Sequence, residues 1–149
     1  MLNAHRPSLF DMLLELFIIN RSGGLIYNRD LSSSAPDISI NDWLRLGSTF
    51  HSLHAIIGQV APIKSSGIDR LDTDSFTLRC FQSLSGVKFV VTADPGTAEL
   101  DSFLRTTYEL YADYVLKVSC SLHYIQIYGS FLVLKLSILV FHPYIEPIP

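Results

Sequence analysis

The distribution of apolar and polar residues predicts a chain that begins with two strands. Residues 12–20 form a nearly continuous apolar run, MLLELFIIN, which is typical of a strand buried on both faces. The pair Gly23-Gly24 follows, and glycine readily adopts the positive φ angles of tight hairpin turns. Residues 25–28 then return as a second strand. We therefore expect an N-terminal β-hairpin, followed by a polar loop at 31–41.

A helical pattern follows this loop. Asn41 or Asp42 is a suitable N-cap, and we expect the helix to continue to about Val60. Gly47 lowers the helix propensity by about 1 kcal/mol, and a close approach to a sheet would explain its presence. Apolar residues recur at steps of three and four, which predicts one buried stripe made of Trp43, Leu46, Phe50, Leu53 and Ile57.

Three more strands are expected at about 68–71, 76–82 and 87–93, separated by polar turns. The middle strand alternates, so Phe76, Leu78 and Cys80 should face one way and Thr77, Arg79 and Phe81 the other. The tripeptide Asp94-Pro95-Gly96 ends this sheet. Thr97 can cap a second helix, whose apolar face is broad and comprises Leu100, Phe103, Leu104, Tyr108, Leu110, Tyr111, Tyr114 and Val115.

The character of the sequence changes after Lys117. Beyond it only Lys135 and Glu146 are charged, and the helical period is lost. We expect three segments: a leader at 1–11, a domain at 12–117 and an atypical apolar tail at 118–149. The tail has three interpretations: a product of alternative splicing or of a retained intron, a structured segment in place of a helix, or a membrane anchor. As a helix, residues 122–141 would span about 30 Å, although a central lysine costs about 2.5–3.5 kcal/mol.

Composition narrows the classes of function. With 48% apolar and 17% charged residues, 149 residues suffice for one domain with a core. A net charge of −3 without any run of Lys or Arg argues against binding of nucleic acid. Cys80 and Cys120 cannot form a disulfide framework, and no signal-peptide pattern opens the sequence, so a reducing, cytoplasmic compartment is expected. Cys80, inside a predicted strand, should be a small buried apolar residue.

No arrangement of residues predicts catalysis or a cofactor site. His51 and His54 stand at i and i+3, a spacing that can hold a metal ion, but no third ligand lies nearby in the sequence. An exposed or partner-facing pair is the preferred interpretation. Asp69, Asp72 and Asp74 lack the glycine and the closing glutamate of a calcium loop. We therefore expect no enzyme, no metal and no cofactor, and a function in recognition between proteins.

Longer motifs identify a family. They are FIINRSGGLIY (Phe17–Tyr27), LGSTFHSLHAI (Leu46–Ile56), SGIDRLDTDSFTLRCFQSLSGVKFVV (Ser66–Val91), ADPG (Ala93–Gly96) and YELYADYVLK (Tyr108–Lys117). Together, over about residues 13–117, they resemble the synbindin family, the subunit-4-type small subunits of the TRAPP vesicle-tethering complex. The resemblance implies an α+β, longin-like (SNARE-like) domain: a five-stranded antiparallel sheet flanked by helices, with the usual last helix replaced by the unrelated tail.

The resemblance also implies a function. Such a chain would be a non-catalytic core subunit in ER-to-Golgi transport, and would contribute to a composite surface that promotes nucleotide exchange on an early-secretory Rab GTPase. Its partners would be other small TRAPP subunits and, through the assembled complex, the GTPase. It would be cytoplasmic and peripheral at endoplasmic reticulum and cis-Golgi membranes. Candidate subunit contacts are Trp43, His51, His54, Tyr108, Tyr111 and Tyr114. The alternative is a longin-like domain anchored by its apolar C-terminal segment.

Two departures from the family pattern stand out. Animal members carry a PDZ-like insertion between the second strand and the first helix, whereas here only residues 30–41 bridge that gap. The chain therefore resembles the compact form of the family. After Lys117 the family continues with a final amphipathic helix, and the sequence VSCSLHYIQIYGSFLVLKLSILVFHPYIEPIP does not match it.

Overall fold

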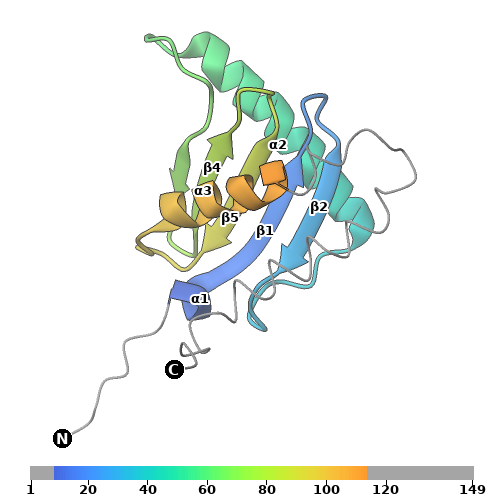
Figure 1. Cartoon of the computed structure of the whole chain (residues 1–149), viewed down its shortest axis with the longest axis vertical. Coiled ribbons are helices and arrows are strands. Elements are labelled where there is room, and N and C mark those ends of the chain that lie inside the picture. Colours follow the sequence, from blue (N-terminus) through green and yellow to red (C-terminus); the bar gives the residue numbers. More distant parts are fainter. Residues whose placement is uncertain (1–8, 114–149) are drawn as a thin grey trace, which may run out of the picture. The chain divides into compact units, whose positions relative to one another are not determined.

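The computed structural model describes residues 9–113 (Figure 1). Expectations for residues 1–8, for Tyr114 and for the tail at 118–149 lie outside the described residues. The chain divides into two compact units, 1–104 and 105–149. Almost the whole described part belongs to the first unit.

The first unit is built on a five-stranded antiparallel sheet with the strand order β2-β1-β5-β4-β3. Its strands are β1 (Leu13–Ile19), β2 (Leu25–Asp30), β3 (Arg70–Asp72), β4 (Thr77–Gln82) and β5 (Lys88–Ala93). Each lies within two or three residues of its predicted position. The predicted α+β class and the longin-like arrangement of sheet and helices are confirmed.

A side chain holds the predicted hairpin turn between β1 and β2. The amide N–H groups of Ser22 and Gly24 donate to Oδ1 of Asn20 at 3.0 and 2.8 Å. Gly23 has a φ of +94°, which glycine adopts without strain. The turn therefore fixes the register in which β2 returns along β1.

Within residues 9–113, three helices accompany the sheet: α1 (Leu9–Met12), α2 (Ile40–Val60) and α3 (Leu100–Tyr111). The sequence did not predict the single turn α1. The N-cap of α2 was predicted wrongly, since Ser39 takes that place and Asn41 and Asp42 lie inside the helix. Ser39 Oγ accepts from the N–H of Asp42 at 3.3 Å and donates to its carboxylate at 2.7 Å, a reciprocal arrangement that satisfies the helix terminus.

The start of α3 also differs from the prediction. Thr97 donates its hydroxyl to the carbonyl of Asp94 at 2.6 Å and so closes the preceding turn instead of capping the helix. Glu99, directly before the helix, has a φ of +63°, an uncommon conformation for a residue with a side chain. The helix therefore begins at Leu100, whereas a cap at Thr97 would have started it at Ala98.

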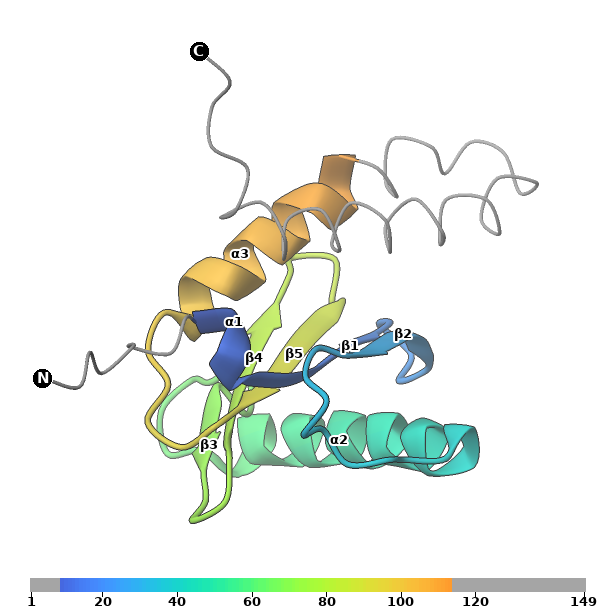
Figure 2. The same ribbon diagram turned by 90° about the horizontal axis from the view of Figure 1, so that it is seen from below.

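The two faces of the sheet are covered differently. Figure 2 shows α2 along one face and the beginning of α3, residues 100–104, over the other. The core on the α2 side consists of Phe17, Ile19, Trp43, Phe50, Leu78, Cys80 and Val90. The predicted alternation along β4 is confirmed, because Leu78 and Cys80 belong to this core while Arg79 reaches Asp101 of α3.

The described part of the second unit, residues 105–113, continues α3 to Tyr111. Thr107 and Tyr111 are buried and Tyr108 is half-buried. Within residues 9–113, no helix combines the length and the apolar character needed to cross a membrane.

Candidate interaction surface

The inner face of α2 is not the stripe that the sequence predicted. Its buried residues are Trp43, Gly47, Phe50 and His54, which follow each other at steps of four, three and four. Leu46, Leu53 and Ile57, assigned to the buried stripe, are exposed. The helix is thus rotated about its axis relative to the prediction. Gly47 and His54 are buried, whereas the hydrophobic pattern predicted burial of the neighbouring Leu46 and Leu53.

The close approach inferred for Gly47 is confirmed. A Cβ atom at this position would lie 3.4 Å from Cβ of Leu25 and 3.9 Å from Cγ1 of Ile19. A larger residue would therefore separate α2 from the β1–β2 hairpin. The small residue lets the helix lie against the sheet, although a single methyl group would also fit there.

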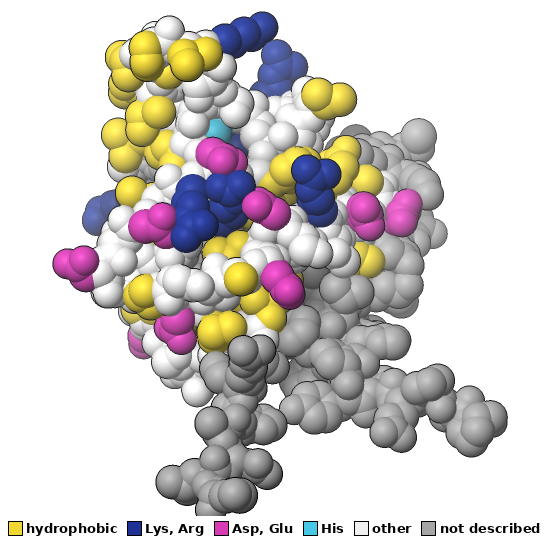
Figure 3. Space-filling view, turned by 90° about the vertical axis from the view of Figure 1, so that its left-hand side faces the viewer, with side chains coloured by type: hydrophobic (Ala, Val, Ile, Leu, Met, Phe, Trp, Pro, Cys, Tyr) yellow, Lys and Arg dark blue, Asp and Glu magenta, His cyan; other side chains and the backbone are white. Residues whose placement is uncertain are grey.

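The rotation leaves an apolar surface exposed, which we call the outer flank: Leu46, Leu53, Ile56, Ile57 and Val60. Their spacing places them on one side of α2, beside the inner face. Ile56 is 53% and Val60 72% exposed. Figure 3 shows apolar side chains gathered at the top of the view, around the end of α2. Exposed apolar side chains grouped in this way make the outer flank a candidate for contact with another molecule.

Trp43 supports this surface from inside. It is 3% exposed, and its ring lies 5.4 Å from that of Phe17, centroid to centroid. Phe17 in turn makes an edge contact with Phe50 at 6.2 Å. The role predicted for Trp43 at a subunit interface stays a prediction, and its burial restricts that role to holding α2 in place.

His54 is buried, so the interpretation of His51 and His54 as an exposed pair is wrong for this residue. Its Nδ1 accepts from the N–H of Ile68 at 3.1 Å, and its Nε2 lies 2.6 Å from Oε1 of Gln82. Because Nδ1 is the acceptor, Nε2 carries the proton and the ring is neutral. Burial lowers the pKa of His54, and the charge of Lys88 lowers it further, although the bond to Gln82 opposes the shift.

His51 points to a different partner. Nζ of the buried Lys88 lies 3.2 Å from its Nδ1 and 3.4 Å from the carbonyl of Gly86. Partial burial and the neighbouring Lys88 lower the pKa of His51, and burial lowers that of Lys88. The two histidines therefore serve separate hydrogen bonds. Within the described residues, no three His, Cys, Asp or Glu side chains gather in a way that could hold a metal.

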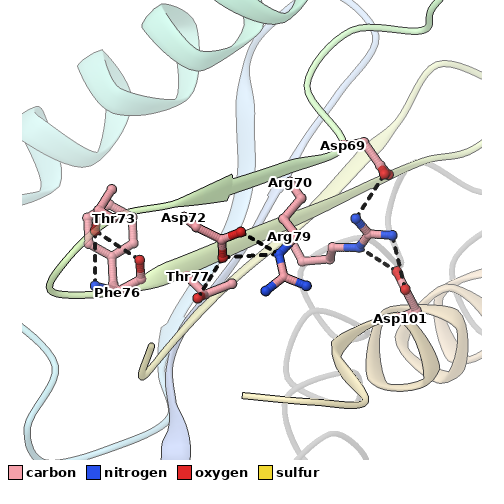
Figure 4. Close-up of polar contacts among 8 residues, drawn as sticks. All are labelled: Asp69, Arg70, Asp72, Thr73, Phe76, Thr77, Arg79 and Asp101. Carbon is pink, nitrogen blue, oxygen red and sulfur yellow. Dashed lines mark hydrogen bonds and ion pairs between the residues drawn. The ribbon is translucent and has the colours of Figure 1, made fainter. Parts of the chain in front are cut away.

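Two of the three aspartates considered as calcium ligands form ion pairs with arginines (Figure 4). Asp69 receives a bond from Arg79 at 2.8 Å, and Asp72 lies 2.7 Å from Nε of Arg70. Arg79 also donates to both carboxylate oxygens of Asp101, at 2.6 and 3.0 Å. Figure 3 shows basic side chains bordered by acidic ones in the middle of the view.

The contact of Arg79 with Asp101 joins β4 to the first turn of α3, and its bidentate geometry makes it more than an ordinary surface ion pair. The hydrogen bond to Asp101 is the main cause that raises the pKa of Arg79. The sequence offered no signal for it, because the two residues lie 22 positions apart.

Cys80 has the predicted character of a buried apolar residue. It is a free thiol in the core, and burial raises its pKa to about 12. A thiol of that pKa is protonated at neutral pH and unsuited to act as a nucleophile.

A cavity lies beside the outer flank. It has a volume of about 690 Å³, and Leu46 and Leu53 of α2 contribute to its wall. Glu15 of β1 also lines it. Sequence reasoning missed Glu15, and the available signal was a carboxylate in the middle of an otherwise apolar strand.

The tyrosines predicted as a second contact surface are only partly described. Tyr111 is buried and Tyr108 half-buried, whereas Tyr114 lies outside the described residues. Their role as subunit contacts stays a prediction.

The comparisons with known proteins agree on one family. The family model described as "Sybindin-like family" matches residues 13–122. Trafficking protein particle complex subunit 4 of Dictyostelium discoideum is 48% identical over 104 residues, which cover 68% of this chain and 76% of that protein. Subunit 4 of Bos taurus is 54% identical over 83 residues, which cover 55% of this chain but only 38% of the bovine protein.

More distant similarities extend beyond subunit 4. Trafficking protein particle complex subunit 1 of Dictyostelium discoideum is 27% identical over 71% of this chain and 78% of that protein. A solved structure titled "MglB with tetrameric arrangement" aligns with a TM-score of 0.42 and 15% identity, over 66% of this chain and 74% of that one, a likeness too low to inform the function. The family match spans more than half of the chain, and the chain belongs to the sybindin-like family.

Proposed function

We propose that the chain is a non-catalytic subunit of a TRAPP-type trafficking complex. Its relatives with 48% and 54% identity bear the name of subunit 4 of the trafficking protein particle complex. The observation that carries the proposal is the outer flank of α2, because a subunit of an assembly needs an apolar surface to bury against its neighbours.

The outer flank is the proposed contact with another small subunit. Val60 and Ile63, at the end of α2 and just beyond it, are 72% and 80% exposed and extend the apolar surface. Trp43 and His54 hold the helix from inside, and His51 lies at the border between the buried and exposed faces. Tyr108, Tyr111 and Tyr114 are proposed as a second, smaller contact.

The finer proposal concerns the GTPase. Within the assembled complex, the chain would contribute to a composite surface that binds the nucleotide-free form of an early-secretory Rab more tightly than the nucleotide-bound form. Such differential binding promotes exchange without bond chemistry, so no catalytic group is required. The complex would act in the cytoplasm, peripherally at endoplasmic reticulum and cis-Golgi membranes.

Co-expression tests this function. The tagged full chain is produced together with the other small TRAPP subunits, and the eluate is analysed by size-exclusion chromatography and mass spectrometry. We expect the chain to elute in one peak with at least one other subunit. Exchange of nucleotide on an early-secretory Rab should be faster with the complete complex than with the complex lacking this chain. Elution of the chain as a monomer, without any other subunit, would contradict the proposal.

A further inference from the structure

The cavity beside α2 has the dimensions of a ligand site. Its volume of about 690 Å³ lies within the range of about 300–1,000 Å³ typical of small-molecule pockets. It is bounded by α2, by β1 and by the chain near residues 36–38 and 75–78, all in the first unit. The apolar part of its wall includes Phe17, Ile38, Phe50, Leu53, Phe76 and Leu78.

One buried polar group in this wall lacks a partner. Glu15 is 5% exposed, and its Oε2 accepts only a long bond from the hydroxyl of Thr92, at 3.5 Å. Its Oε1 is buried and has no hydrogen-bond partner among the described residues. Buried polar atoms are rarely left in this state, because the loss of hydration is not compensated. The carboxyl group of Glu15 therefore has a capacity for hydrogen bonding that the described residues do not use.

The charges around Glu15 determine which group fits. Asp30 of β2 lies directly opposite Glu15 in the register of the sheet. Burial, and then the charge of Asp30, raise the pKa of Glu15. Arg45 lines the cavity too, but its side chain is 81% exposed and its guanidinium faces Asp42 at 3.5 Å. A cation beside Glu15 would be attracted by both carboxyl groups, whereas an anion would be repelled by them.

We propose that this cavity binds a small apolar amine, whose hydrocarbon body contacts the aromatic and aliphatic wall while its ammonium group donates a hydrogen bond to the carboxyl group of Glu15. Shape and charge each contribute: the apolar wall accepts the body, and the carboxyl group of Glu15 selects the head group. The site lies within one chain, so the inference does not depend on assembly into a complex.

Three probes with one body and different head groups test the proposal on the full chain. They are 4-phenylbutylamine, 4-phenylbutanol and 4-phenylbutanoate. Trp43, the single tryptophan, reports binding through its fluorescence, because it packs on Phe17 of the cavity wall. We expect saturable binding of the amine, with an affinity about tenfold higher than that of the carboxylate, since a charged hydrogen bond is gained in one case only. The alcohol should lie between them.

Two pairs of variants separate the contributions. Glu15→Gln keeps the size of the side chain and should remove the preference for the amine, with little change for the alcohol. Thr49→Phe places a ring at the cavity wall and should weaken all three probes, while Ser48→Phe, an exposed change on the other side of α2, should weaken none. Circular dichroism verifies that each variant is folded.

The proposal is overturned if the amine does not saturate the protein, if it binds no better than the carboxylate, or if Glu15→Gln binds it as well as the unmodified chain. An equal effect of Thr49→Phe and Ser48→Phe would likewise exclude this cavity as the binding site.

Discussion

The inner face and the outer flank of α2 differ in burial: the inner face is packed on the sheet, whereas the outer flank is exposed. On the inner face, apolar rings pack in the core and the one polar side chain, His54, has both ring nitrogens hydrogen-bonded. On the outer flank, the aliphatic side chains stay between 36% and 72% exposed. The inner face holds the helix on the sheet. The outer flank contributes less to folding, and it is the surface that we propose for binding.

The two faces should differ in how much stability the fold loses when a side chain is truncated. Removing a buried ring leaves a cavity and destroys close contacts, so it weakens the fold. Removing an exposed aliphatic side chain changes little in the isolated chain, because water already surrounds it. The two faces can therefore be separated experimentally by measuring stability and assembly on the same variants.

The largest effect is expected from Trp43→Ala. Truncation of a buried aromatic ring in contact with Phe17 should lower the free energy of unfolding by about 3–5 kcal/mol. Urea denaturation followed by circular dichroism measures this loss. Leu44→Ala, at the half-exposed neighbouring position, is the control and should cost less than about 1 kcal/mol. Equal losses for both variants would contradict the assignment of the inner face.

Gly67→Ala should destabilise the fold, because Gly67 lies directly against the backbone and the ring of His54. Gly67 has a φ of +125°, and a Cβ atom there would clash with the carbonyl oxygen and the ring of His54. We expect a loss of about 2–3 kcal/mol by the same urea titration. Gly96→Ala is a matched control, because Gly96 also has a positive φ but open space around it. Its loss should be only about 1 kcal/mol, and a similar loss at both sites would show that the contact with His54 is unimportant.

Acidification tests the neutral state of His54. Since its pKa is lowered in the folded chain, the unfolded chain binds the proton first as the pH falls below about 6.5. Stability is therefore complete above that pH and decreases below it, by at most about 1.4 kcal/mol per pH unit for one group. His54→Gln should show a flatter profile between pH 6.5 and 5.5. His51, whose pKa is also lowered, would leave a residual slope. Identical slopes for both proteins would refute the assignment.

The smallest effect on stability is expected on the outer flank. Ile56→Gln and Val60→Gln replace exposed side chains, so the free energy of unfolding should stay within about 0.5 kcal/mol of the original. Urea denaturation again gives the value. A loss above about 1.5 kcal/mol would mean that this flank is packed inside the folded chain and is not available to a partner.

The sheet could be predicted from the sequence because its signals are local. Alternation along β4, the glycine pair after β1 and the Asp-Pro-Gly turn after β5 each follow from a few neighbouring residues. The rotation of α2 could not be predicted, because Gly47 and His54 are buried for reasons that depend on the distant residues Leu25 and Gln82.

The candidate surfaces were less predictable than the fold. The outer flank could not be recognised from the sequence, because Leu46, Leu53 and Ile57 fit the helical periodicity that normally marks a buried stripe. The unpaired oxygen of Glu15 depends on which groups lie around it in the folded chain. Local patterns predict which element a residue belongs to. They do not specify which face of an element is covered, because that depends on contacts between elements far apart in the sequence.

The most direct test of the account is assembly of an outer-flank variant with the other small TRAPP subunits. Ile56→Lys combined with Val60→Lys places charges on the flank, and Leu84→Lys makes the same change at a fully exposed leucine in the turn before β5. Sedimentation or co-purification gives the affinity. We predict that the flank variant binds at least about tenfold more weakly while remaining folded, and that Leu84→Lys binds normally. Unchanged assembly of the flank variant would contradict the central claim that α2 faces a partner.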